Sequence, residues 1–122
     1  AARFADEFNV PFASIEDTTA MFERVRKACA DIQRDPDELV YSNALVLCCG
    51  RTDAEVAQRA AAIGRDVDEL RENGLAGSPA ELVDKIGRYA ETGSKRIYLQ
   101  TLDLDDLDHL ELVASQVAPQ LA

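Results

Sequence analysis

The chain has 122 residues, 47% of them apolar, which suffices for one globular domain that buries roughly two thirds of its unfolded surface. Its 23 acidic and 13 basic side chains give a net charge of −10, which argues against a nucleic-acid or anionic-membrane partner because phosphate binding depends on Lys and Arg. No run approaches the roughly 18 apolar residues of a membrane span, and the first residues lack the pattern of a signal peptide, so we expect a cytoplasmic protein.

The first part of the chain predicts a strand followed by a helix. Residues 1–5 have helix-forming side chains with no capping signal before them, which indicates the end of a helix. Asp6–Val10 is a short strand candidate that Pro11 stops, because proline cannot donate to a strand ladder. Ser14 then caps a helix whose apolar residues recur at helical spacing to about Gln33.

A second strand and two small helices are expected next. Val40–Cys49 is an almost continuous apolar run, as expected for a strand that helices cover on both faces. The chain's three cysteines, two of them adjacent at the end of this run and pointing to opposite faces, are interpreted as reduced core thiols. Thr52 caps an alanine-rich helix that we place outside the main layer, and Asp66–Glu72 predicts one or two further turns. The Asn-Gly pair at 73–74 predicts a turn.

The local signals are clearest in the last third of the chain. Ser78 and Glu81 form a capping box, and Gly93 supplies the left-handed residue that ends the helix. The strand candidate Arg96–Leu102 follows, and the acids from Asp103 onward start a final helix. We expect that helix to bury one face, formed by Leu107, Leu110, Val113, Ala114 and Val117.

This order of elements predicts an α/β fold. Strands that alternate with helices form a parallel sheet with right-handed crossovers. A sheet of only three strands has two open edges, and open edges pair with other strands unless they are covered. The chain is therefore expected to be part of a larger α/β protein, or to complete its sheet through another chain.

Several polar residues invite a chemical interpretation that the surrounding sequence does not support. His109 is the only histidine and has no metal ligand at a suitable spacing, so we expect a solvated helix residue. The acids of 103–108 lack the Gly and distal Glu of a calcium loop and are interpreted as a helix start. Ser78 opens a helix that could receive a phosphate, but its capping box favours a plain cap. No nucleophile elbow, P-loop or dinucleotide motif occurs, so we predict no catalytic residue and no metal site in this chain.

Three blocks of the sequence, residues 1–12, 41–65 and 74–114, carry a resemblance. They read AARFADEFNVPF, YSNALVLCCGRTDAEVAQRAAAIGR and GLAGSPAELVDKIGRYAETGSKRIYLQTLDLDDLDHLELVA. In this order they resemble the C-terminal portion of the luciferase-like monooxygenase superfamily, and within it the oxidoreductases that use coenzyme F420. Two departures are Phe8, where many relatives carry Trp, and Gln33, where Gly is frequent.

The resemblance implies a TIM (β/α)8 barrel of which this chain supplies the last three strand–helix units. It implies a parent oxidoreductase that uses F420 or FMN, with the phosphate loop and the main catalytic residues before Ala1. Chemistry in such barrels occurs at the C-terminal ends of the strands. Asn9 and Arg51 stand at such ends and are the substrate-side candidates, while the cofactor-binding residues of this chain remain unassigned.

Two hypotheses of function follow. In the first, the chain is part of a cofactor-dependent oxidoreductase, to which it supplies barrel wall and substrate-side contacts, with the missing N-terminal barrel segment as partner. In the second, it is a non-catalytic α/β module that forms a homo-oligomer, or binds another protein, through its open sheet edges.

Overall fold

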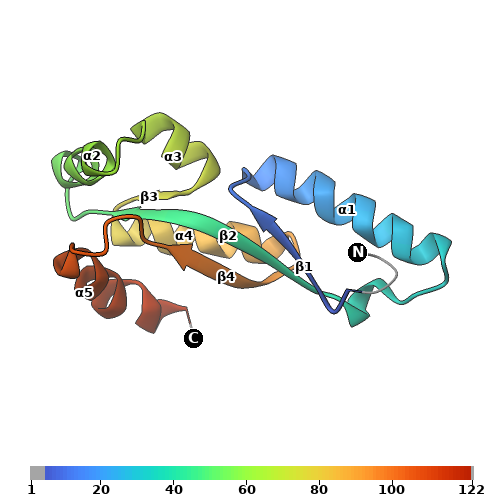
Figure 1. The fold of residues 1–122 in the computed structure, drawn as a ribbon. Coiled ribbons are helices and arrows are strands. Elements are labelled where there is room, and N and C mark those ends of the chain that lie inside the picture. The colour runs from blue at the N-terminus through green and yellow to red at the C-terminus, as the bar shows by residue number, and fades with distance from the viewer. Residues whose placement is uncertain (1–4, 122) are drawn as a thin grey trace.

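The computed structural model describes residues 5–121, so residues 1–4 of the expected helix end lie outside the described part. Figure 1 shows helices arranged around a small, strongly bent sheet. The strands are β1 (Glu7–Pro11), β2 (Val40–Cys49), β3 (Leu75–Gly77) and β4 (Ser94–Gln100). The helices are α1 (Ile15–Asp31), α2 (Asp53–Ala62), α3 (Val67–Asn73), α4 (Pro79–Glu91) and α5 (Leu107–Gln116), with short 3-10 turns at Pro36–Glu38 and Ala118–Gln120.

The long strand β2 is the centre of the sheet, and every pairing with it is parallel. β1 pairs along positions 40–44 of β2, and β4 pairs along positions 41–46. β3 lies on the same edge of β2 as β1, at the other end of the strand. The Val40 amide donates to the Asp6 carbonyl before β1, and the Gly50 amide donates to the Gly77 carbonyl of β3. Backbone amides an even number of residues apart in a strand point to the same edge. The predicted parallel α/β architecture is confirmed.

The strand β3 was not predicted from the sequence. The Asn-Gly pair at 73–74 is not a free turn, because Asn73 ends α3 and Gly74 leads directly into the strand. β3 is only three residues long, and all three are buried against β2. Such a strand exists through its pairing partner, so no periodicity of its own sequence could indicate it.

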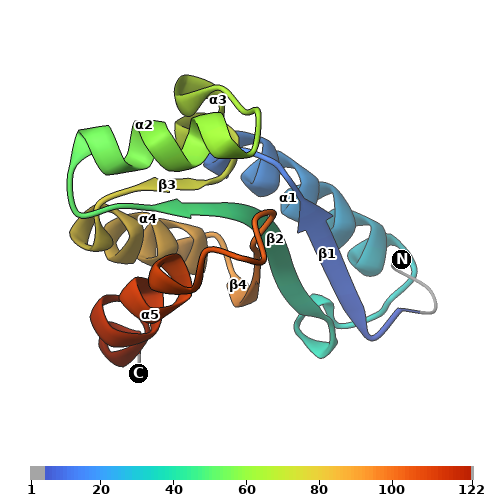
Figure 2. The same cartoon turned by 60° about the vertical axis from the view of Figure 1, so that its left-hand side comes forward.

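Different helices cover the two faces of β2 toward its C-terminal end. Leu45 and Leu47 pack with residues of α4 such as Leu82, whereas Val46 and Cys48 pack against α2 and α3 on the opposite face. Figure 2 shows α2 and α3 on one side of the sheet and α4 on the other. The alanine-rich helix therefore lies outside the main helix layer, as predicted. The three cysteines are free and buried, and the adjacent pair divides between the two faces.

The predicted caps set the helix starts. Ser14, Thr52 and Ser78 each accept a hydrogen bond from the backbone amide three residues later, and Ser78 forms the full capping box with Glu81. At the other end of α1, Gln33 has a φ of 61°, a left-handed conformation that favours glycine. β4 is shifted two residues toward the N-terminus relative to the predicted strand.

Helix α5 differs from its prediction in both its start and its buried face. It begins at Leu107 with Asp106 as the N-cap. A turn precedes the helix, in which the Asp103 side chain accepts a hydrogen bond from the Asp105 amide and the Asp103 carbonyl accepts one from the Asp106 amide. Leu107 and Leu110 are 70% and 41% exposed, which contradicts the prediction for these two residues, whereas Val113 and Val117 of the predicted face are buried. The side chains that the helix buries are His109, Leu112, Val113 and Val117.

The prediction that His109 is solvated is also wrong. The side chain is 5% exposed, and its Nε2 accepts a hydrogen bond of 2.8 Å from the backbone amide of Cys49. That amide is the last of β2 and lies beyond the end of β4, so no strand partner satisfies it. His109 therefore supplies the acceptor that a neighbouring strand would otherwise supply. The sequence could not indicate this hydrogen bond, because the two residues lie 60 positions apart.

Candidate functional site

The face of β2 that α2 and α3 cover toward its C-terminal end carries polar side chains beside β1 and β4, where the other face carries core residues. Along β1, Val10 packs in the core with Phe22 of α1, so its neighbour Asn9 projects to the opposite face. The same alternation places Ser42 on β2 and Tyr98 on β4 on that polar face. Asn9 Nδ2 donates to Ser42 Oγ at 3.0 Å, which joins the first two strands there.

A network centred on Glu7 crosses the sheet on this face. The Tyr98 hydroxyl donates to Glu7 Oε1 at 2.9 Å, and the Arg96 guanidinium lies 3.4 Å from Glu7 Oε2. Glu7 is on β1 while both partners are on β4, so the network spans β2. The pKa of Glu7 lies below its usual value because hydrogen bonds from Ser42 and Tyr98 stabilise the carboxylate, with Arg96 adding to the effect.

A shallow concavity of about 400 Å³ lies on this polar face. Glu7, Asn9, Ala44 and Tyr98 line it, so three neighbouring strands contribute to one surface. Tyr98 is 48% exposed and offers part of an aromatic ring together with a hydroxyl. The concavity combines hydrogen-bond donors, a carboxylate and a ring, which suits contact with a polar organic ligand.

Arg51 lies in a different part of the molecule from Asn9. It follows the far end of β2, whereas the pairing with β1 ends at Ala44. Its guanidinium lies 3.3 Å from Glu55 and 3.4 Å from Asp108. The structure thus places the two sequence candidates in separate clusters and gives Arg51 two carboxylate neighbours.

The cluster around Arg51 is organised by Arg59, which the sequence analysis did not single out. Arg59 is 11% exposed and donates at 2.8 Å to both Asp106 and Glu55, at 3.0 Å to Asp108, and at 2.8 Å to the Cys49 carbonyl. It therefore binds the end of β2 to the start of α5. The spacing from Glu55 to Arg59, four residues on one helix, was the available signal.

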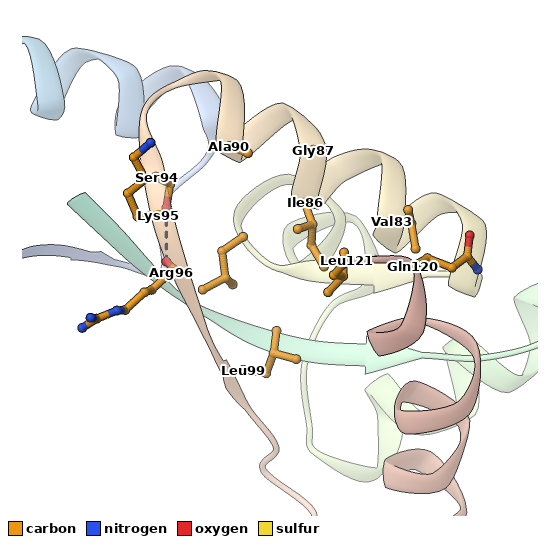
Figure 3. Close-up of a pocket in the computed structure, with 11 residues that line it drawn as sticks. Val83, Ile86, Gly87, Ala90, Ser94, Lys95, Arg96, Leu99, Gln120 and Leu121 are labelled. Carbon is orange, nitrogen blue, oxygen red and sulfur yellow. Dashed lines mark hydrogen bonds between the residues drawn. The ribbon is translucent and has the colours of Figure 1, made fainter. Parts of the chain in front are cut away.

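The side of the sheet beyond β4 is open. A groove of about 470 Å³ lies between α4 and β4, and the end of the described chain forms its rim. Figure 3 shows Ile86 and Leu99 projecting into the groove, while Arg96 extends away from it toward the polar face. Apolar side chains dominate the lining, among them Val83, Ile86, Ala90, Ile97, Leu99 and Leu121. Because β4 pairs only with β2, its outer edge is free of strand partners within residues 5–121.

Residues 5–121 contain neither a candidate membrane span nor a candidate metal cluster. No helix there combines the length and apolar character needed to cross a membrane. In that same part of the chain, no group of three or more His, Cys, Asp or Glu side chains is arranged to hold a metal ion.

Comparison with known proteins defines the class of fold. No family model matches the sequence, and no curated protein sequence matches it. Solved structures of luciferase-like monooxygenases match it over essentially its whole length. The chain thus has an α/β fold found within the barrels of this class, and the resemblance seen in the sequence is confirmed for the fold.

Three of these structures illustrate the likeness. A coenzyme F420-dependent tetrahydromethanopterin reductase from Methanopyrus kandleri has a TM-score of 0.79 and 15% identity, covering 100% of this chain and 47% of its own. An EDTA monooxygenase from Chelativorans sp. BNC1 has a TM-score of 0.74 and 17% identity, with coverages of 99% and 42%. A riboflavin lyase, solved with modified FMN and riboflavin, has a TM-score of 0.72 and 14% identity, with coverages of 98% and 39%. The chain therefore spans less than half the length of each.

The polar face fits only part of a flavin or deazaflavin site. Such a nucleotide needs contacts for its flat ring and a cation or free helix start for its phosphate. Tyr98 and Asn9 suit the first need. For the second, Arg96 beside the polar face and Arg51 beyond the end of β2 are already paired with carboxylates, and Glu81 occupies the start of α4. The described residues fit one wall of a ligand site and not its phosphate subsite.

Proposed function

We propose that this chain supplies the last three strand–helix units of a luciferase-like (β/α)8 oxidoreductase that uses F420 or FMN. The units are β1–α1, β2–α4 and β4–α5, with α2, α3 and β3 inserted after β2. A barrel segment with the remaining strands is the proposed partner. The polar face of the sheet then lines the barrel interior, and the groove beside β4 faces the neighbouring unit.

The full coverage of this chain by structures more than twice its length carries the proposal. The fold supports it in a second way, because the polar network faces away from α1 and α4, as the interior side of a barrel wall does. Eight strands also cannot be assembled from copies that contribute three each. A segment with five further strands is therefore a better complement than a second copy.

The proposal assigns different roles to the two candidate residues. Asn9 faces the interior and would contact substrate, whereas Arg51 would contact it only if its pairs with Glu55 and Asp108 open. In the assembled enzyme, Asn9→Ala is expected to raise KM about tenfold, equivalent to roughly 1.4 kcal/mol. Arg51→Ala is expected to change KM by less than half of that factor, and a larger effect of Arg51 would reverse the assignment.

Purification from the native source tests the proposal directly. We expect the intact denatured mass to reveal a co-purifying barrel segment, the native mass to equal their sum or a multiple, and the absorbance to show a flavin or deazaflavin. A single colourless 13.3 kDa species would overturn it.

The alternative is a non-catalytic module that self-associates through its sheet edges. The free outer edge of β4 and the apolar groove beside it favour this alternative. A colourless assembly that contains only this chain, and whose mass rises with concentration, would support the module over the oxidoreductase.

A further inference from the structure

The exposed apolar side chains of this molecule are concentrated near its C-terminal end. Within residues 5–121, ten large hydrophobic residues are exposed, and seven of them lie from Tyr98 to Leu121. Leu104 and Leu107 are the most exposed of all, at 74% and 70%. A contiguous exposed apolar surface on a folded protein usually marks an interaction site.

These leucines form a stripe along α5 and the turn before it. Leu107, Leu110 and Ala114 recur at helical spacing and are all exposed, so they share one face of the helix. Leu104 precedes them by three residues. We call these four residues the leucine stripe. The opposite face of α5 is committed to the core through Leu112, Val113 and Val117.

The surroundings of the leucine stripe are acidic. No Lys or Arg occurs after Arg96, whereas five acids lie between Asp103 and Glu111. Asp106 and Asp108 are paired with Arg59, and Arg51 adds to the second pair. Within residues 5–121 no cation pairs with the other three, Asp103, Asp105 and Glu111. An apolar stripe beside unpaired acids is complementary to a basic amphipathic helix.

The leucine stripe follows the open side of the sheet in the sequence. Leu99 of β4 lines the groove, and the exposed Leu102 and Leu104 come between it and α5 along the chain. Leu121, which follows α5, lines the same groove. A unit that pairs with β4 would bring its own helix beside α5, because the helices of such units lie in one layer.

We propose that the leucine stripe binds a basic amphipathic helix of the segment that completes the barrel. This inference rests on the proposed function and adds the chemistry of the partner: leucine-like residues at i, i+3 and i+7, flanked by Lys or Arg. Charge selects against the alternative occupant, a second copy of this chain, because a second copy would bring the same acids to the contact.

The test uses this chain alone and a synthetic peptide. The peptide is a 15-residue helix with Leu at i, i+3 and i+7 and Lys beside them, and its control has Glu in place of Lys. We expect calorimetry to show binding of the Lys peptide that weakens with added salt. Binding of the Glu peptide with equal affinity would overturn the proposal.

Matched variants locate the binding surface. Leu107→Ser with Leu110→Ser is expected to weaken binding more than tenfold, and Asp105→Asn with Glu111→Gln severalfold. The control removes two exposed acids from α1, with Glu23→Gln and Asp31→Asn, and is expected to leave affinity unchanged. If the serine variant binds as the parent chain does, the leucine stripe is not the site.

Two outcomes separate this inference from the proposed function. If the barrel segment and a chromophore co-purify but the Lys peptide does not bind, the inference fails and the oxidoreductase assignment stands. If sedimentation shows that the chain self-associates and that Leu107→Ser with Leu110→Ser abolishes it, a second copy is the occupant and the inference is overturned. In the co-purified assembly, a photo-cross-linker at position 107 is expected to join the barrel segment, and linkage to any other chain would overturn the inference.

Discussion

Strands β2 and β4 are hydrogen-bonded neighbours, yet their surroundings differ sharply. Leu45 of β2 and Leu99 of β4 are directly paired, and the first is 0% exposed while the second is 39% exposed. Helices cover β2 on both faces toward its C-terminal end, whereas β4 lies at an open edge beside a groove. The same residue type in the same sheet is thus a core residue on one strand and a surface residue on the next.

The difference shows that the sheet is covered around β2 and open beside β4. Around β2, Arg59 and His109 satisfy the last polar groups of the strand, and α4 fills the core. Around β4, apolar side chains remain exposed, and no strand of the described residues 5–121 pairs with the outer edge. A free edge with apolar neighbours favours association, which agrees with both the barrel proposal and its alternative.

The largest expected effect separates the paired leucines. Leu45→Ala is expected to destabilise the chain by about 2–5 kcal/mol, because it leaves a cavity in the core. Leu99→Ala is expected to cost no more than about 0.5 kcal/mol, because the side chain is already exposed to water. Urea unfolding of the two variants measures the difference. Equal losses would mean that β4 is as well covered as β2 in solution.

The next effect compares two arginines that share the same carboxylates. Arg59→Ala is expected to cost about 2–3 kcal/mol, because it removes the cation that pairs with Asp106 and the donor to the Cys49 carbonyl. Arg51→Ala removes exposed pairs only and is expected to cost at most about 1 kcal/mol. Thermal or urea unfolding decides, and a larger loss at Arg51 would contradict the central position given to Arg59.

His109 tests how the end of β2 is satisfied. His109→Leu is expected to cost about 1–3 kcal/mol, because the Cys49 amide loses its acceptor. Burial lowers the pKa of His109, with the Arg59 charge acting in the same direction, so the unfolded chain binds the proton more readily. Stability is therefore full above the unfolded pKa near 6.5 and falls as pH decreases below it.

The variant His109→Leu serves as the control for this pH dependence, because it has no imidazole at position 109. Between pH 6.5 and 5, the parent chain is expected to lose more free energy of unfolding than His109→Leu loses. Parallel pH profiles for the two proteins would show that the histidine is not buried in its neutral form.

The smallest effect lies away from both strands, at the end of α1. Gln33→Gly is expected to stabilise the chain by about 0.5–1 kcal/mol, because glycine adopts a φ of 61° without strain. Gln33→Ala has the same strain as the parent residue and is expected to change stability little. A destabilised glycine variant would show that the glutamine side chain makes a compensating contact.

Features that depend on neighbouring residues in the chain could be predicted from the sequence. The caps at Ser14, Thr52 and Ser78 are such features, because a hydroxyl and an amide three residues apart decide them. The parallel order of the sheet also follows, since helices separate the principal strands. Asn9 belonged to the candidate site for a similar reason, because it stands near the end of a short strand.

The site around Arg59 could not be predicted in the same way. Its partners come from α2 and from the turn before α5, and the sequence distance from Arg59 to Asp106 is 47 residues. The interpretation of these acids as a helix start agrees with Asp106, which caps α5. The pairing of Asp106 with Arg59 forms only when α2 and the start of α5 come together in the fold.

The sequence by itself determined the α/β class, the principal helices and the acidity of the C-terminal third, because short-range hydrogen bonds, periodicity and composition decide these. Only the tertiary structure decided that β3 exists, that His109 is buried and that Leu107 is exposed. The physical reason is the same for all three. Apolar periodicity shows that a helix has a face to bury, but which face meets the core depends on where distant strands end and on which side of the sheet is covered.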